Sequence, residues 1–171
     1  GRLLEEDLFT KYSIIDSRTP EGQKIHDFLA ARAQALASKY VDFDKTPVTF
    51  VLSDSDKPNA FYAPAPDPDP DKKPRRSDYE TIRFIKNPLD TPIICVTRGL
   101  IEMVDNLDQL DFVLGHELTH MIMRQHGIEH NSKGEEELAD LHAVDLMYDA
   151  GGDPKQALLM SRKISAYSKE Q

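Results

Sequence analysis

Tryptophan is absent from this sequence, and cysteine occurs once, at Cys95. A single cysteine excludes a disulfide within the chain. The sequence has no run of about 18 apolar residues, so no segment is predicted to span a membrane. Basic residues are also in the minority, with 21 Lys and Arg against 30 Asp and Glu, which gives a net charge of −9. We therefore expect no attraction to nucleic acid or to anionic lipid.

The composition is that of a globular protein, with 39% hydrophobic and 30% charged residues. A chain of 171 residues is long enough for one domain with a substantial core. We predict a single domain over residues 1–171, with an N-terminal arm or helix at 1–19. Proline and aspartate recur in residues 64–78, which are predicted to form an exposed loop. The sequence leaves the oligomeric state open, and leaves the localisation open between the cytoplasm and the bacterial periplasm or another extracytoplasmic space.

The predicted elements combine a small sheet with several helices. Thr19 and Pro20 start a helix whose apolar residues recur at helical spacing up to Tyr40. β-Branched and aromatic stretches bounded by turn residues predict three strands, at 48–52, 79–85 and 92–96. The last two strands are expected to pair antiparallel across a turn at 88–90. A short helix at 100–104 and a longer one capped by Asn106 follow, so we predict an α+β fold.

The sequence HELTH at positions 116–120 matches the HExxH pattern and lies in a largely apolar stretch. Residues four apart on an α-helix lie about 40° apart on one face, so His116 and His120 can bind one metal ion. Glu117 points about 100° away from His116, beside a water on the metal rather than at the metal itself. Two His ligands and a carboxylate base are typical of a zinc peptidase.

A catalytic zinc needs a third protein ligand, and two residues are candidates. His126 has the spacing of the longer HExxHxxGxxH pattern, but Met123 stands where that pattern has a glycine turn. Glu136 lies on the next predicted helix, 135–150, where a helical wheel places it among apolar residues. A carboxylate on an apolar face needs a positive partner. The sequence therefore favours Glu136 as the third ligand, with His126 as the alternative.

Asp140 lies one helical turn after Glu136, and the same wheel places it on the apolar face. Its carboxylate is predicted to accept the free N–H of His116 or His120, which would fix the tautomer of that ring. The wheel places Glu135 on the opposite, solvent-facing side. An ion pair between Asp140 and an arginine is the alternative interpretation.

Several segments together resemble a known family of zinc peptidases. This family includes the CAAX-prenyl-protein protease, the HtpX heat-shock peptidase and soluble periplasmic relatives. The segments that carry the resemblance occur in the same order along the chain: Asn59-Ala60-Phe61, Thr97-Arg98-Gly99-Leu100-Ile101, residues 111–120, Glu136 followed by Leu138-Ala139-Asp140, and residues 150–154. The resemblance implies a zincin-like, minigluzincin fold: a small antiparallel or mixed sheet packed on the HExxH helix and on a following helix that bears a glutamate.

The resemblance also implies roles for individual residues. His116, His120 and Glu136 would bind one Zn²⁺, Glu117 would be the general base, and residues 59–61 (Asn59, Ala60 and Phe61) would lie near the substrate cleft. The expected function is a zinc endopeptidase acting on a peptide or protein, either as a soluble member or as an excised peptidase domain. An edge strand in the region 79–96 is expected to align the extended peptide. Two alternatives stay open: a metalloprotease with His126 as third ligand, and a metal-stabilised binding domain without catalysis.

Overall fold

The computed structural model describes residues 14–15, 19–63, 91–127 and 133–169. The loop predicted at 64–78 and the strand predicted at 79–85 lie outside the described residues. Of the predicted N-terminal arm or helix, only Ile14–Ile15 and Thr19 are described, and Ile14–Ile15 forms a short strand, β1, rather than a helix.

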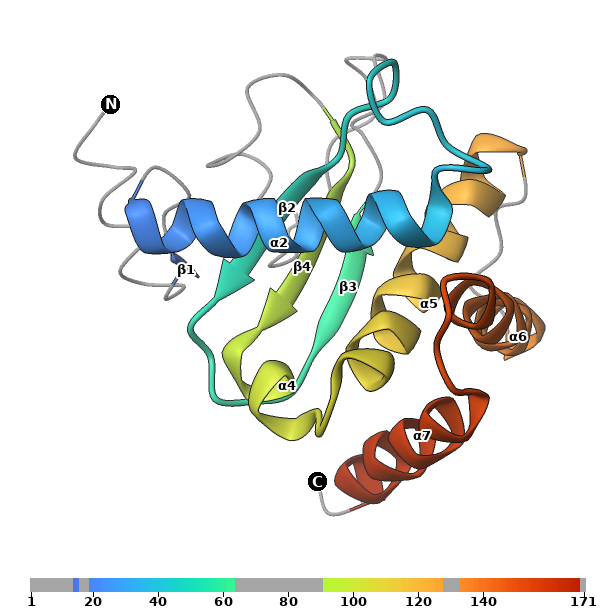
Figure 1. Cartoon of the computed structure of the whole chain (residues 1–171). Helices are drawn as coiled ribbons and strands as arrows, with labels where there is room; N and C mark the ends of the chain where they lie inside the picture. The colour runs from blue at the N-terminus through green and yellow to red at the C-terminus, as the bar shows by residue number, and fades with distance from the viewer. Residues whose placement is uncertain (1–13, 16–18, 64–90, 128–132, 170–171) are drawn as a thin grey trace, which may run out of the picture.

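A mixed sheet forms one layer of the molecule, and its strands follow the order β1-β2-β4-β3 (Figure 1). The three longer strands are β2 (Thr49–Ser53), β3 (Ala60–Ala63) and β4 (Ile93–Thr97). β2 and β4 run parallel, whereas β3 is antiparallel to β4 and β1 is antiparallel to β2. The predicted α+β class is confirmed. β3 was not among the predicted strands.

β4 is an interior strand, because it pairs with β2 on one side and β3 on the other. All five of its residues are buried, as expected for a strand covered on both faces. The sequence placed an edge strand that could align a peptide in the region 79–96. For β4 that expectation is wrong, since both of its edges are paired. Among the described residues, β3 is the outer strand on this side of the sheet.

Helices pack against the sheet and against one another. α2 (Pro20–Ala37) crosses one face of the sheet, and Thr19 caps it by accepting a hydrogen bond from the Gly22 N–H at 3.1 Å (Figure 1). The helices after β4 are α4 (Arg98–Met103), α5 (Leu107–Gln125), α6 (Lys133–Asp149) and α7 (Pro154–Lys169). No helix within the described ranges is both long enough and apolar enough to cross a membrane.

α5 is the central helix of the fold, in contact with α2, α6, α7 and β3. Twelve of its residues are buried, so its surroundings on most sides are protein rather than water. Asn106 caps it by accepting a hydrogen bond from the Gln109 N–H at 3.0 Å. The side chain of Gln109 accepts a hydrogen bond from the N–H of Asp105, one residue before the cap, at 2.9 Å.

An ion pair within the core fixes α5 against α2. Arg32 donates two hydrogen bonds to the buried carboxylate of Asp111, from Nε at 3.0 Å and from Nη2 at 2.7 Å. The hydrogen bond and charge of Asp111 raise the pKa of the Arg32 guanidinium, against a smaller opposing effect of burial. Two parallel hydrogen bonds fix the relative orientation of the two side chains as well as their separation. The ion pair fixes α5 about one and a half turns before His116.

The junction between β4 and α4 holds the start of β3 in place. Thr97 Oγ1 donates to the carbonyl of Lys57 at 2.8 Å and accepts from the N–H groups of Asn59 and Leu100. Gly99 lies against the same loop, where a Cβ would come 2.2 Å from the carbonyl oxygen of Asp56. Only glycine allows that approach. The segments around 59 and 97–99, which carried part of the family resemblance, are therefore in direct contact.

Candidate metal centre

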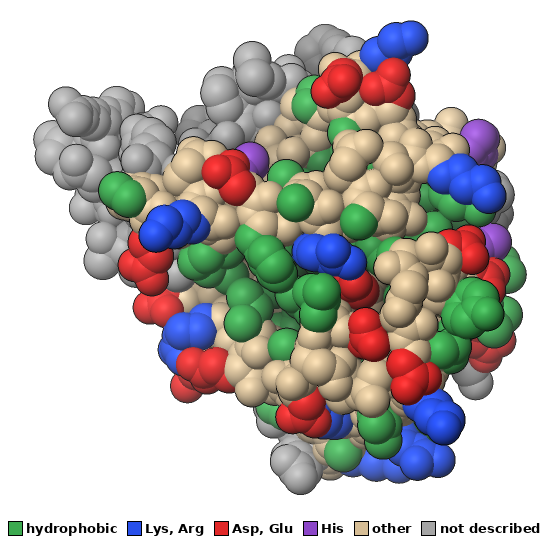
Figure 2. All heavy atoms as spheres, in the orientation of Figure 1, with side chains coloured by type: hydrophobic (Ala, Val, Ile, Leu, Met, Phe, Trp, Pro, Cys, Tyr) green, Lys and Arg blue, Asp and Glu red, His purple; other side chains and the backbone are tan. Residues whose placement is uncertain are grey.

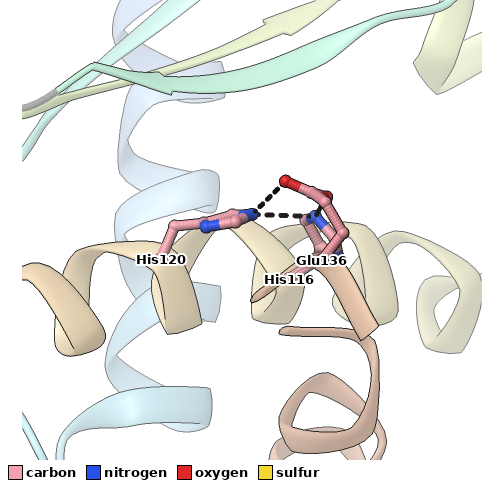
Figure 3. Close-up of side chains that lie close together, drawn as sticks. All are labelled: His116, His120 and Glu136. Carbon is pink, nitrogen blue, oxygen red and sulfur yellow. Dashed lines mark hydrogen bonds and ion pairs between the residues drawn. The ribbon is translucent and has the colours of Figure 1, made fainter. Parts of the chain in front are cut away.

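Two histidines of α5 and a glutamate of α6 converge on one point (Figure 3). The Nε2 atoms of His116 and His120 lie 3.1 Å apart. Glu136 Oε2 lies 2.9 Å from Nε2 of His116, and its Oε1 lies 3.1 Å from Nε2 of His120. One ligand atom from each residue lies within 4.8 Å of the others, and within the described residues this is the group able to hold a metal ion.

The other nitrogen of each ring also meets a carboxylate. His116 Nδ1 lies 2.6 Å from Asp140 Oδ1, and His120 Nδ1 lies 3.1 Å from Glu135 Oε1. Because an ionised carboxylate only accepts, each Nδ1 carries the proton. A neutral ring protonated at Nδ1 has its lone pair at Nε2, where the three side chains meet. Two imidazole nitrogens and a carboxylate oxygen are the donor set that suits zinc, so the residues present fit that ion.

The helical wheel was wrong about which glutamate is buried. The side chain of Glu136 is 57% exposed and that of Asp140 is 51% exposed, so neither is covered by an apolar face. Glu135, placed on the solvent side by the wheel, is only 10% exposed and contacts His120. The buried stripe of α6 comprises Ala139, Ala143, Leu146 and Met147. At the first turn of α6, Glu135 and Glu136 contact the two histidines.

Glu117 is buried beside the two histidines, on the side of β3. Burial raises the pKa of its carboxyl to about 8. The positive charge of His116 and a hydrogen bond from the backbone N–H of Tyr62 oppose that rise. The negative charges of Glu136 and Asp140 add to it. The site thus holds a carboxyl group whose proton affinity is well above that of an ordinary glutamate.

The pKa of His116 is also raised, and the cause lies in its acidic surroundings. Burial is the largest single influence and lowers the pKa of the ring. The hydrogen bond to Asp140 and the negative charges of Glu117, Asp140 and Glu136 together outweigh burial. A ring with carboxylates on both nitrogens attracts positive charge, and either a proton or a metal ion at Nε2 supplies it.

His126 lies outside this cluster. α5 runs without interruption through Met123 to Gln125, and the exposed His126 is its C-cap. Ten helical residues correspond to about 15 Å along the axis, so His126 and His116 are far apart. Its role as the alternative ligand has no support from the group of converging side chains.

Two further parts of the sequence can be placed relative to the site. Ala60 and Phe61 belong to β3, the strand beside α5, and Asn59 immediately precedes it. Their role in a substrate cleft stays a prediction. Cys95 is buried in β4, and burial raises the pKa of its thiol to about 12, so it is no candidate nucleophile at neutral pH.

Acidic side chains gather on the face of the molecule drawn in Figure 2, and lysine and arginine side chains lie between and around them. Both signs of charge are therefore interleaved on this face.

Comparison with known proteins gives one family match. The model of peptidase family M48 matches residues 89–132. The matched segment covers β4, α4 and α5, and therefore includes His116, Glu117 and His120 but not Glu136. No curated protein matches the chain. The match supports the M48 zinc metallopeptidase family, and hence a metallopeptidase, without distinguishing the CAAX-prenyl protease or HtpX type within it.

Proposed function

We propose that this protein is a zinc-dependent endopeptidase in which His116, His120 and Glu136 bind one Zn²⁺. The observation that carries the proposal is the convergence of these three side chains, with ligand atoms within 4.8 Å of one another. Asp140 contacts the other ring nitrogen of His116, and the buried Glu117 lies beside the two histidines. A glutamate as third ligand would place the protein among the gluzincins. The M48 match supports the proposal through the segment that contains both histidines.

Zinc bound here would lower the pKa of a coordinated water and polarise the carbonyl of the scissile peptide bond. Glu117 would take the proton from the attacking water at its carboxylate and later deliver it to the leaving amine. Burial raises the pKa of the Glu117 carboxyl in the metal-free protein. The positive charge of a bound Zn²⁺ would favour the ionised carboxylate that accepts the proton. The Tyr62 backbone N–H orients the carboxylate of Glu117 by donating to it.

β3 is the strand that we propose for aligning an extended peptide, in place of the region 79–96. Thr97 donates from its N–H to the carbonyl of Asn59, so every second residue of β3 bonds to β4. By this alternation the backbone groups of Ala60 and Tyr62 point away from β4. The N–H of Tyr62 reaches Glu117, so this side of the strand is the one beside the proposed base. A peptide added there would pass close to the metal position.

The alternatives from the sequence find less support. For His126 to be a ligand, the chain would have to turn back at Met123. α5 instead continues through Met123 as a regular helix. A metal-stabilised domain without catalysis has no need for Glu117, whose burial beside the ligands is costly unless the carboxyl has a function.

The variant Glu117→Gln tests the proposal, with Glu137→Gln as a control, because Glu137 is exposed on α6. Both proteins should bind zinc as the wild type does. Glu117→Gln should lower cleavage of an unfolded protein on the order of 10²–10⁴-fold, since general-base catalysis typically contributes that much. The control should cleave at the wild-type rate. Cleavage by Glu117→Gln within a few-fold of wild type would remove Glu117 from the mechanism.

A further inference from the structure

Glu135 and Glu136 are neighbours in the first turn of α6, yet they approach opposite sides of the same ring. Glu136 meets His120 at Nε2 and Glu135 meets it at Nδ1, both at 3.1 Å. Consecutive residues on a helix diverge by about 100°, which allows the two carboxylates to reach around the imidazole. The first turn of a helix is also where negative side chains are stabilised by the helix dipole.

Geometry excludes Glu135 as a ligand of the same ion. The two ring nitrogens of an imidazole direct their bonds away from each other. The Nε2 of His120 faces Glu136 and His116, so a carboxylate at Nδ1 lies behind the ring from the metal position. What Glu135 can do there is accept the Nδ1–H.

Resting on the proposed function, we propose that Glu135 is a positioning residue that holds His120 in the metal-binding orientation and tautomer. Its side chain is nearly buried, at 10% exposure, and His120 is half-buried beside it. Because this hydrogen bond is shielded, water competes little for the Nδ1–H of His120. The carboxylate also raises the basicity of Nε2, as partners behind metal-bound histidines generally do.

Glu135 and Asp140 thereby form a matched pair, each behind one histidine. Asp140 contacts Nδ1 of His116, and its side chain is half exposed. Glu135 contacts Nδ1 of His120 from a position shielded from water. Because the shielded bond excludes water as a substitute acceptor, loss of Glu135 should weaken metal binding more than loss of Asp140.

The test compares Glu135→Ala, Glu135→Gln and the control Glu137→Ala. Zinc affinity is measured by competition with a chromophoric chelator, which requires no peptidase activity. Glu135→Ala should weaken zinc binding about 10- to 100-fold, the usual effect of removing a partner behind a ligand. Glu135→Gln should restore most of the affinity, because its amide oxygen still accepts from Nδ1–H. Glu137→Ala should match the wild type.

A second readout is the ring proton of His120, observed by NMR in both the metal-free and the zinc-loaded protein. A hydrogen-bonded Nδ1–H resonance is expected in the wild type and in Glu135→Gln, and it should vanish in Glu135→Ala. Zinc affinity of Glu135→Ala within twofold of Glu137→Ala, or an unchanged Nδ1–H resonance, would overturn the proposal. If the wild type bound no zinc, the proposed function would fail, and the resonance in the metal-free protein would still decide the role of Glu135. If the variants behaved as expected but the zinc-loaded wild type cleaved no peptide, only the proposed function would fail.

Discussion

Gly115 of α5 lies directly against Ala143 of α6. A Cβ at position 115 would come 3.2 Å from Cα and 3.3 Å from Cβ of Ala143. This close approach has a consequence for the site, which begins one residue later at His116. Because α6 lies this near to α5, the side chain of Glu136 spans the remaining distance to His116 and His120.

Enlarging Gly115 should therefore damage the metal site through the spacing of the two helices. Gly115→Ala requires a shift of a few tenths of an ångström, whereas Gly115→Val requires a larger one. We expect Gly115→Val to lower the free energy of unfolding by about 1–3 kcal/mol, as overpacking typically does. Zinc affinity should fall in the order glycine, alanine, valine. A valine at the exposed Asp145 of α6 is the control, and equal zinc affinity across the Gly115 series would contradict this role of helix spacing.

The Arg32–Asp111 pair should stabilise the position of α5 against α2. Arg32→Met leaves the carboxylate of Asp111 buried without its partner. We expect the free energy of unfolding to fall by about 2–4 kcal/mol. This is toward the low end for buried pairs, because the side chain of Arg32 is 22% exposed. Urea unfolding measures this loss. The double variant Arg32→Met, Asp111→Leu should recover much of it, because no charge then remains buried.

The matched control for that pair is Arg98→Met. Arg98 forms its ion pairs with Asp54 and Glu102 at the surface, so its loss should matter far less than the loss of Arg32, as is usual for exposed pairs. If Arg32→Met unfolded at the same urea concentration as Arg98→Met, the Arg32–Asp111 pair would have no special role in holding α5.

Three alanine variants identify the third ligand. Glu136→Ala should lose zinc when dialysed against a weak chelator, because the ion then has only two protein ligands. His126→Ala and Glu137→Ala should retain one zinc per chain, since both residues are exposed and outside the cluster. Metal analysis by mass spectrometry measures the content. Zinc retained in Glu136→Ala but lost in His126→Ala would reverse the assignment.

Local patterns in the sequence were sufficient to predict parts of this arrangement. Four-residue spacing places His116 and His120 on one face of α5 whatever surrounds the helix, and the Asn106 cap depends only on nearby residues. The side chain of Glu136 was correctly expected near the histidines, but for a reason that does not hold, since it is exposed rather than buried.

Features that depend on distant partners could not be predicted in the same way. β3 spans only Ala60–Ala63, and it pairs with β4, a strand that lies far along the sequence. The burial of Glu135 depends on where α5 crosses the first turn of α6, which a helical wheel of α6 alone cannot include. The sequence does show a carboxylate, Glu135, next to the predicted ligand Glu136. Its role could be recognised only once α5 was known to pack against this turn of α6.

The proposed chemistry is tested most directly by measuring cleavage of an unfolded protein as a function of zinc bound per chain. Zinc is removed with a chelator, the chelator is dialysed away, and zinc is returned in substoichiometric steps. We predict no cleavage by the metal-free protein and a rate that rises in proportion to bound zinc, reaching its limit at one ion per chain in the wild type. Cleavage that persists without metal, or a chain with one zinc at His116, His120 and Glu136 that cleaves nothing, would contradict the proposed function.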